Sequence, residues 1–306
     1  MNYLFRIFLF GLSILALILF MEYEYKKIPN DYTYKSKYIE SYSDSIEVLV
    51  LGSSHSYTGV NPKYFDKNCF NFALLSQSVN YDYFILEKYI NQLTNLQYVI
   101  LPVSYPTLTT ILEERPYNSW RKYNYVHYID STKKSISNQL HISNYLTISY
   151  NPGTLIIKQL VLHWIFNTNN IECHKNGWLE LPAISDLDLK TSAMHAAKRH
   201  ENHSFEFKRN MLYMQNIINL CNQKNTKLIL YTPPATNYYI NYLNSYKWEI
   251  IQEKCYNLAE QYSNVYYINY MNDPRYNNEL FRDADHLNEE GTKLLSQDLN
   301  AFIGSF

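Results

Sequence analysis

Short apolar runs that alternate with helix-like segments are the feature that most restricts the fold of this 306-residue chain. The runs are rich in β-branched residues and leucine and end at Gly, Pro or polar residues, as buried strands do. They lie at residues 46–51, 69–75, 98–103, 228–232 and 265–268. Amphipathic spacing predicts helices over residues 81–93, 205–221, 248–262 and 288–302. This order predicts an α/β domain with a doubly wound parallel sheet of about five strands.

The amino-terminal segment predicts a membrane anchor. Residues 7–21 carry no charge, while Arg6 precedes them and Glu22, Glu24, Lys26 and Lys27 follow. A 15-residue helix rises about 22 Å, and residues 3–5 lengthen it if Arg6 snorkels to the interface of a ~30 Å hydrocarbon core. A cleaved signal peptide needs small residues before the cut, which LFMEYEY does not supply. We therefore predict an uncleaved signal anchor over residues 1–24, with a cleaved signal peptide as the alternative and a buried core helix disfavoured.

We expect the short amino-terminal tail to stay in the cytoplasm, which places the rest of the chain outside it. Residues 25–44 are polar and rich in tyrosine and predict a stalk. Residues 45–306 form the predicted α/β domain, interrupted at about 105–203 by a segment without strand alternation. Since this segment leaves the carboxyl end of the third strand, where such sheets place their sites, we expect a lid or substrate-binding insertion. A structural elaboration far from the chemistry is the alternative.

Composition excludes several functions. The chain has 27 Lys and Arg against 28 Asp and Glu, so no overall positive field favours nucleic acid. A mean hydropathy of −0.36 excludes a protein with many membrane spans. The four cysteines lack the spacing of a structural zinc site, and we predict neither a metal nor an organic cofactor. Whether a disulfide forms, and in which of three pairings, stays open for Cys69, Cys173, Cys221 and Cys255.

Two polar blocks stand at the predicted carboxyl edge of the sheet, at residues 52–56 and 283–288. A serine hydroxyl needs a neighbouring base to become a nucleophile, and an imidazole is the side chain best matched to that at neutral pH. An aspartate three residues before a histidine can fix its tautomer. Ser54, His286 and Asp283 have this pattern, and Gly52 permits a tight turn before Ser54. In the alternative interpretation, Ser54 only caps the following helix.

This layout resembles the SGNH, or GDSL-like, hydrolase superfamily over most of the predicted domain. The closest subset is a group of membrane-anchored bacterial proteins with a GSSH start, an N-x-A-x-x-S-Q segment and a terminal D-x-D-H-L-N-x-x-G. These motifs correspond to residues 52–55, 71–77 and 283–291. The resemblance implies a flavodoxin-like sheet, Ser54 as nucleophile, His286 as base and Asp283 as its orienting acid. Alginate acetylation proteins and the teichoic-acid D-alanine transfer protein, which move acyl groups on exported polymers, have a similar arrangement.

The chain departs from the superfamily where oxyanion donors are expected. The Gly block and the Asn block of the family are not recognisable after the second and third strands. Ser76, Gln77 and Ser104 are the substitute donors we predict, and His55 is a second candidate for acid–base chemistry or substrate contact, or else packs in the turn.

Together with the residue pattern, the resemblance implies a serine esterase or O-acyltransferase, anchored in a bacterial membrane by one helix, with its catalytic domain extracytoplasmic. Its expected substrates are acylated polysaccharides of the cell envelope or small esters, and a membrane-bound acyltransferase is a candidate partner. The alternative is a catalytically inactive SGNH-like module that binds glycan or a membrane partner. Phosphoryl or nucleotide chemistry is disfavoured because the chain has no Gly-rich phosphate loop.

Overall fold

A computed structural model describes residues 3–115, 117–130, 140–182, 184, 187–201 and 206–306. The chain divides into two compact units. The helical unit comprises residues 1–36 and 119–172, and the sheet unit comprises residues 37–118 and 173–306. Residue 205, the expected start of one helix, and residue 203, at the end of the expected insertion, lie outside the described residues. The predicted domain boundaries remain a prediction.

The sheet unit is built on five parallel strands, which confirms the predicted fold class. The strands run in the order β2-β1-β3-β4-β5, the flavodoxin-like arrangement. In β1, Val50 pairs with Asn71 of β2 on one side and Ile100 of β3 on the other. The strand bounds are Val48–Val50 (β1), Cys69–Asn71 (β2), Tyr98–Pro102 (β3), Lys227–Thr232 (β4) and Val265–Asn269 (β5).

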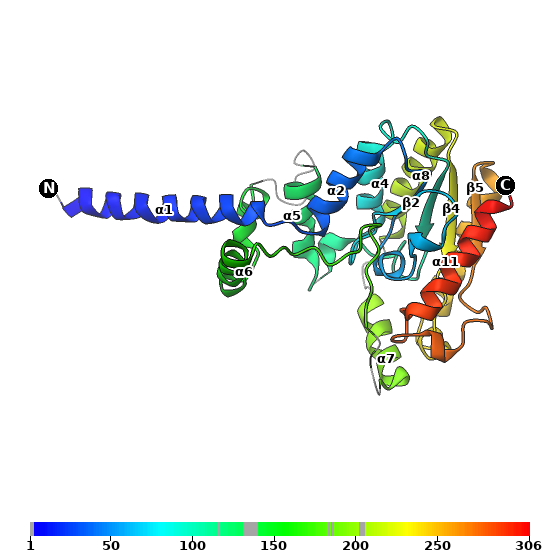
Figure 1. Ribbon diagram of the computed structural model, residues 1–306. Coiled ribbons are helices and arrows are strands. Elements are labelled where there is room, and N and C mark those ends of the chain that lie inside the picture. Colours follow the sequence, from blue (N-terminus) through cyan, green and yellow to red (C-terminus); the bar gives the residue numbers. More distant parts are fainter. Residues whose placement is uncertain (1–2, 116, 131–139, 183, 185–186, 202–205) are drawn as a thin grey trace. The chain divides into compact units, whose positions relative to one another are not determined.

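Helices cover both faces of the sheet because successive strand residues point to opposite sides. On one face, Val48, Ile100 and Ile229 share a buried cluster with Leu295 and Leu299 of the last helix. Figure 1 shows α11 on this side of the sheet and α4 and α8, which pack on each other, on the other side. The long helices of this unit are α4 (Val79–Tyr89), α8 (Phe207–Gln223), α10 (Ser245–Gln261) and α11 (Glu289–Gly304).

Shorter elements complete the sheet unit. The α-helical ones are α3 (Ser54–Tyr57), α7 (Leu189–His200) and α9 (Asn237–Ile240). The 3₁₀ turns are η1 (Pro62–Tyr64), η2 (Leu112–Glu114) and η7 (Asn278–Leu280). The four cysteines are free.

The helical unit contains α1 (Tyr3–Lys27), which is long and apolar enough to cross a membrane. In Figure 1 the carboxyl end of α1 lies beside α6 (Gly153–Phe166). The Glu22 carboxylate of α1 accepts hydrogen bonds from the backbone N–H of Thr147 at 2.9 Å and of Ile148 at 3.1 Å. The remaining elements are η3 (Ser119–Arg121), α5 (Lys122–Asn124), the π-helical turn η4 (Tyr125–Ile129), η5 (Ile142–Asn144) and η6 (Thr147–Ser149).

The segment expected to be a stalk contains a helix. α2 (Asp31–Tyr42) begins in the helical unit and continues along the chain into the sheet unit. Its Tyr38 ring stacks on Phe70 of β2 with centroids 4.1 Å apart.

Candidate active site

A tight turn after β1 positions Ser54. Gly52 has a φ of +112°, a conformation that side chains other than glycine rarely adopt, and a Cβ added there would lie 2.3 Å from Cγ of Pro102. The chain then enters α3, with Ser54 as the first helical residue. The first N–H groups of a helix have no carbonyl partner within the helix, so the backbone here can donate to a polar group beside Ser54. Ser54 is half-buried at this position.

Three side chains predicted from the sequence form a chain of hydrogen bonds. Nε2 of His286 lies 2.9 Å from Oγ of Ser54. Nδ1 of the same imidazole lies 2.9 Å from Oδ1 of Asp283. Since one ring nitrogen faces the hydroxyl and the other faces the carboxylate, a neutral ring protonated on Nδ1 presents its lone pair to Ser54.

The turn between β5 and α11 holds the carboxylate and the imidazole together. Oδ1 of Asp283 also accepts the backbone N–H of His286 at 2.9 Å and of Asp285 at 3.2 Å. Its other oxygen accepts a hydrogen bond from the Arg282 guanidinium at 3.2 Å. Asn288 ends the turn by accepting the backbone N–H of Gly291, which caps α11. The turn therefore brings the side chains of Asp283 and His286, three residues apart in sequence, into contact.

A second carboxylate faces the same imidazole. Asp285 has a side chain only 1% exposed, and its Oδ1 lies 3.5 Å from Nδ1 of His286. Its Oδ2 lies 3.4 Å from Nε2 of His55 and 3.7 Å from Nε2 of His200. Arg199 approaches Oδ1 at 3.8 Å. Among the described residues, neither oxygen of Asp285 has a hydrogen-bond partner, so this buried anion is balanced by charge at longer range.

The two other imidazoles of this cluster are buried. His55 stacks on His286, with ring centroids 5.1 Å apart and planes 17° from parallel. Nδ1 of His200 contacts the hydroxyl of Tyr239 at 2.7 Å. Burial lowers the pKa of His55 and lowers that of His200 well below its usual range, so both rings are expected to be neutral at pH 7.

Among the three imidazoles, His286 is the one whose protonated form is favoured. Burial alone would lower the pKa of this imidazole, but the carboxylates of Asp285 and Asp283 outweigh burial and raise it to about 10. Burial likewise opposes ionisation of Asp285, yet the neighbouring imidazoles keep its pKa well below its usual range. Both carboxylates approach the Nδ1 side of the ring, and this arrangement favours the protonated imidazole.

The side chain of Gln77, predicted as an oxyanion donor, instead binds Asp82, which also binds the turn at Gly52. Its Nε2 donates to Oδ1 of Asp82 at 2.6 Å, and the same oxygen accepts the backbone N–H of Gly52 at 2.7 Å. Burial raises the pKa of Asp82 to about 7. This network ties the segment after β2 to the turn that carries Ser54.

Ser104 and Ser76 occupy turns after β3 and β2. The Ser104 hydroxyl lies 2.9 Å from the hydroxyl of Thr107, whose Oγ1 also accepts the backbone N–H of Ser104. Ser76 has a φ of +61°, unusual for a residue with a side chain. The N–H of Leu74, two residues earlier, donates to the carbonyl of Gly52 at 3.1 Å. The Ser76 turn is thus joined to the turn that precedes Ser54.

Three side chains lie close enough together to share a metal ion. One ligand atom each from His55, Asp285 and His286 fall within 4.8 Å of one another. Both nitrogens of His286 already contact Ser54 and Asp283, so a metal ion bound here would displace one of those contacts. The geometry fits the hydrogen-bonded chain better than a metal centre.

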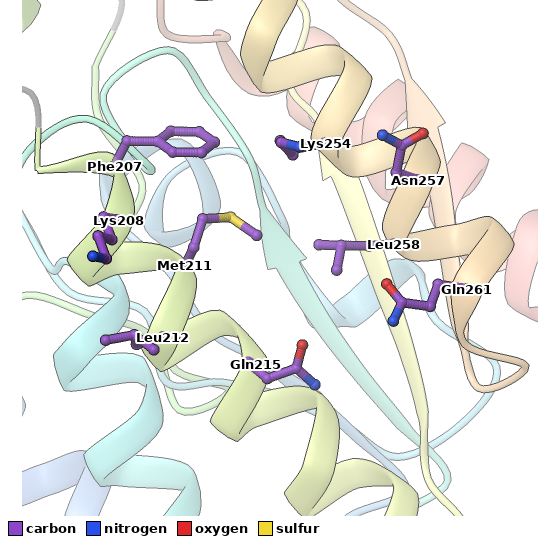
Figure 2. Close-up of a pocket in the computed structure, with 9 residues that line it drawn as sticks. All are labelled: Phe207, Lys208, Met211, Leu212, Gln215, Lys254, Asn257, Leu258 and Gln261. Atoms are coloured by element: carbon purple, nitrogen blue, oxygen red, sulfur yellow. The ribbon is translucent and has the colours of Figure 1, made fainter.

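One cavity of the sheet unit borders Asp283, and a larger one lies away from it. A cavity of about 360 Å³ is bordered by Asp283, Asp285 and residues of α7, including Arg199. Figure 2 shows a larger pocket, about 610 Å³, between α8 and α10. Its lining includes Lys208 and Lys254 but no serine, histidine or carboxylate, so this pocket offers neither a hydroxyl nucleophile nor a base of that kind. The other lining residues are Phe207, Met211, Leu212, Gln215, Asn257, Leu258 and Gln261.

Comparisons with known proteins assign this chain neither a family nor a function. No family model matches the chain, and no curated protein matches it. One crystal structure with similarity to the chain is that of a Bacteroides fragilis protein described as a "putative acylhydrolase". It is 10% identical, with a TM-score of 0.43, over 88% of this chain and 95% of that chain. The function proposed for this chain therefore rests on its own geometry.

Sequence reasoning missed the surroundings of the triad. Asp285 was given no catalytic role from the sequence, although its place beside His286 was a signal for a second charge. His200 and Tyr239 belong to no recognisable motif, and only the packing of α7 and α9 brings them to Asp285. Arg275, in the loop between β5 and the Asp283 turn, pairs with Asp273 and Asp298.

Proposed function

We propose that this protein is a serine esterase or O-acyltransferase in which Ser54 is the nucleophile, His286 the base and Asp283 its orienting acid. The observation that supports this most is the pair of 2.9 Å contacts that link the three side chains. An isolated serine at a helix start needs no histidine within hydrogen-bond distance, whereas a nucleophile does.

The reaction begins with proton transfer from Ser54 to Nε2 of neutral His286 while Oγ attacks the carbonyl carbon of an ester. The tetrahedral intermediate collapses when His286 returns the proton to the leaving alcohol oxygen, which leaves an acyl group on Ser54. Water or a sugar hydroxyl then attacks the acyl carbon, with His286 again taking and returning one proton. Hydrolysis and transfer therefore differ only in the acceptor that reaches the acyl-enzyme.

Backbone groups are the oxyanion donors we favour. The side chains of Gln77 and Ser104 bind Asp82 and Thr107, so their roles in this proposal are structural. The N–H of Ser54, at the first position of α3, and the N–H of Ser76, in its left-handed turn, remain candidates. His55 supports the ring of His286 by stacking.

The proposed location is a bacterial membrane, with α1 as a single-pass anchor and the sheet unit outside the cytoplasm. Its length and exposed apolar surface support α1 as a membrane span. The proposed substrates are ester-linked acyl groups of cell-envelope glycans, with small esters as simpler substrates and a membrane-bound acyltransferase as a candidate partner. The family resemblance of the motifs supports this substrate class.

A second candidate function is a catalytically inactive module that binds glycan or a membrane partner. The raised pKa of His286 favours it, since an imidazolium cannot accept the proton of Ser54. Catalysis requires that the imidazole lose its proton when substrate binds or when the pH rises.

Labelling of the full chain in detergent with a fluorophosphonate tests both candidates. We expect labelling that strengthens from pH 7 to pH 10 and disappears in Ser54→Ala and His286→Ala. Ser104→Ala, which removes a hydroxyl bonded to Thr107, is the matched control and should label like the parent. If folded protein does not label at any pH, and hydrolyses no small ester, the proposal of an enzyme is wrong and the binding module replaces it.

A further inference from the structure

The helix α6 in the helical unit presents an unusual surface. Its 14 residues rise about 21 Å, too short to cross a ~30 Å hydrocarbon core. Only Ile156 and Leu160 are buried, and Lys158 is the single Lys, Arg, Asp or Glu residue of the helix. Six large apolar side chains are 40% to 67% exposed, which is far more than solvent-facing helices normally carry. They are Leu155, Ile157, Val161, Trp164, Ile165 and Phe166.

The buried side of α6 packs on the carboxyl end of α1. Ile156 and Leu160 share a cluster with Tyr25 and Ile28. The Tyr25 hydroxyl donates to Oε1 of Gln159 at 2.8 Å. These contacts fix the position of α6 relative to α1 within one compact unit.

α6 contacts α1 where the apolar stretch of α1 ends. Phe20 is 51% exposed, and Glu22 is the first charged residue of α1 after the uncharged stretch that follows Arg6. Trp164 of α6 lies 6.2 Å from Phe20 between ring centroids, and its indole N–H donates to Oε2 of Glu24 at 3.2 Å. An indole with one apolar and one hydrogen-bonded side is typical of a membrane interface.

We propose that α6 is a second membrane-contacting element that lies in the bilayer interface beside the end of α1. The proposal rests on the proposed anchoring by α1, because a bilayer that covers Phe20 also reaches Trp164 on the neighbouring helix. The exposed apolar residues of α6 enter the boundary between headgroups and acyl chains, as interfacial helices do. The ammonium group of Lys158 reaches back toward the headgroups.

A lipid bilayer fits this surface better than a soluble partner does. The apolar surface of α6 is continuous with that of α1 through the contact between Trp164 and Phe20. A soluble partner would have to bind an apolar face that borders the bilayer itself. With α1 and α6 both in contact with lipid, the helical unit is held at two elements, which restricts its rotation about the axis of α1.

Depth-dependent quenching in lipid nanodiscs tests the proposal on the full chain. A Cys173→Ser background removes the one cysteine that is not buried. Single cysteines are then introduced by Leu12→Cys in the middle of α1, Ile165→Cys in α6, and Leu212→Cys on the exposed surface of α8, and each is labelled with a fluorophore. Lipids with a nitroxide near the headgroup end or near the methyl end of the acyl chain, and aqueous iodide, serve as quenchers.

We expect the label at residue 165 to lose more fluorescence to the shallow nitroxide than to the deep one. The label at residue 12 should show the reverse order, and the label at residue 212 should respond to iodide only. Quenching at residue 12 without quenching by lipid at residue 165 would overturn the role of α6 while anchoring by α1 stands. If residue 165 is shielded from both lipid and iodide, a protein covers α6 and the proposal is wrong. If residue 12 is not quenched by lipid, anchoring itself fails and the role of α6 fails with it.

Discussion

The second carboxylate beside His286 gives a prediction with an unusual sign. In Asp285→Asn, the imidazole keeps its 2.9 Å contact with Asp283 but loses a buried negative charge 3.5 Å away. Since that charge favours the imidazolium, removing it lowers the pKa of His286. We therefore expect the variant to be more active than the parent at neutral pH and less active in alkali.

The size of the shift follows from the distance. Two unit charges 3.5 Å apart attract by about 5 kcal/mol at an effective dielectric constant of about 20, which corresponds to roughly three pKa units. The pKa of His286, about 10 in the parent, would then fall to roughly 7. At pH 7.5 the neutral fraction would rise from under about 1% to roughly three quarters. A weaker base costs about tenfold in the limiting rate, so we expect a net gain of roughly twentyfold at pH 7.5.

The assay is the rate of fluorophosphonate labelling of the full chain between about pH 6 and pH 10. The parent rate should rise with pH throughout this range, because His286 must lose its proton before it can accept that of Ser54. The variant rate should level off near pH 7 to 8, so the two profiles cross. Glu47→Gln removes a carboxylate just before β1, at the opposite end of the strand from Ser54, and should leave the parent profile unchanged.

Coincident profiles of parent and Asp285→Asn would refute the charge argument. A profile that keeps its shape but falls at every pH would mean that Asp285 positions His286 without setting its charge. Circular dichroism and thermal unfolding of both proteins at each pH show whether the variant remains folded.

Three further predictions concern stability. Gly52→Ala should lower the free energy of unfolding by about 2 kcal/mol or more, measured by urea unfolding, because its Cβ meets Pro102 and its φ is positive. Asp82 should cost stability as the pH rises from about 4 to 7, since the unfolded carboxyl ionises near 3.8 and the folded one near 7; Asp82→Asn should remove this fall in a pH series of thermal unfolding. Trp178→Phe leaves the buried carbonyl of Thr58 without its 2.7 Å indole hydrogen bond and should cost about 1–2 kcal/mol in urea, whereas an unchanged unfolding midpoint would contradict that contact.

The strands and long helices could be predicted because their signals are local. The apolar runs at β1, β3, β4 and β5 appear in the structure within three residues of their expected ends, and so do the helices α8, α10 and α11. The helix α4 ends at Tyr89, four residues before its expected end. The second run was predicted over residues 69–75, but β2 ends at Asn71, where the side chain accepts the N–H of Ala73 and turns the chain. Such a side-chain contact leaves no trace in the hydrophobic pattern.

The triad residues were also readable, because each lies next to a strand end in a short polar block. Parallel strands bring their carboxyl ends to one edge, so blocks 232 residues apart in sequence could be expected to meet.

The amino-acid sequence by itself determined the alternation of strands and helices, the apolar character of α1 and the residue types at the sheet edge. Tertiary structure alone decided which neighbours those residues have. In the folded chain the Gln77 amide donates to Asp82, and three imidazoles lie around Asp285. The helix α6 packs on α1. The physical reason is that periodicity and turn chemistry act over a few residues, whereas burial of a charge and contact between helices depend on segments far apart in the chain.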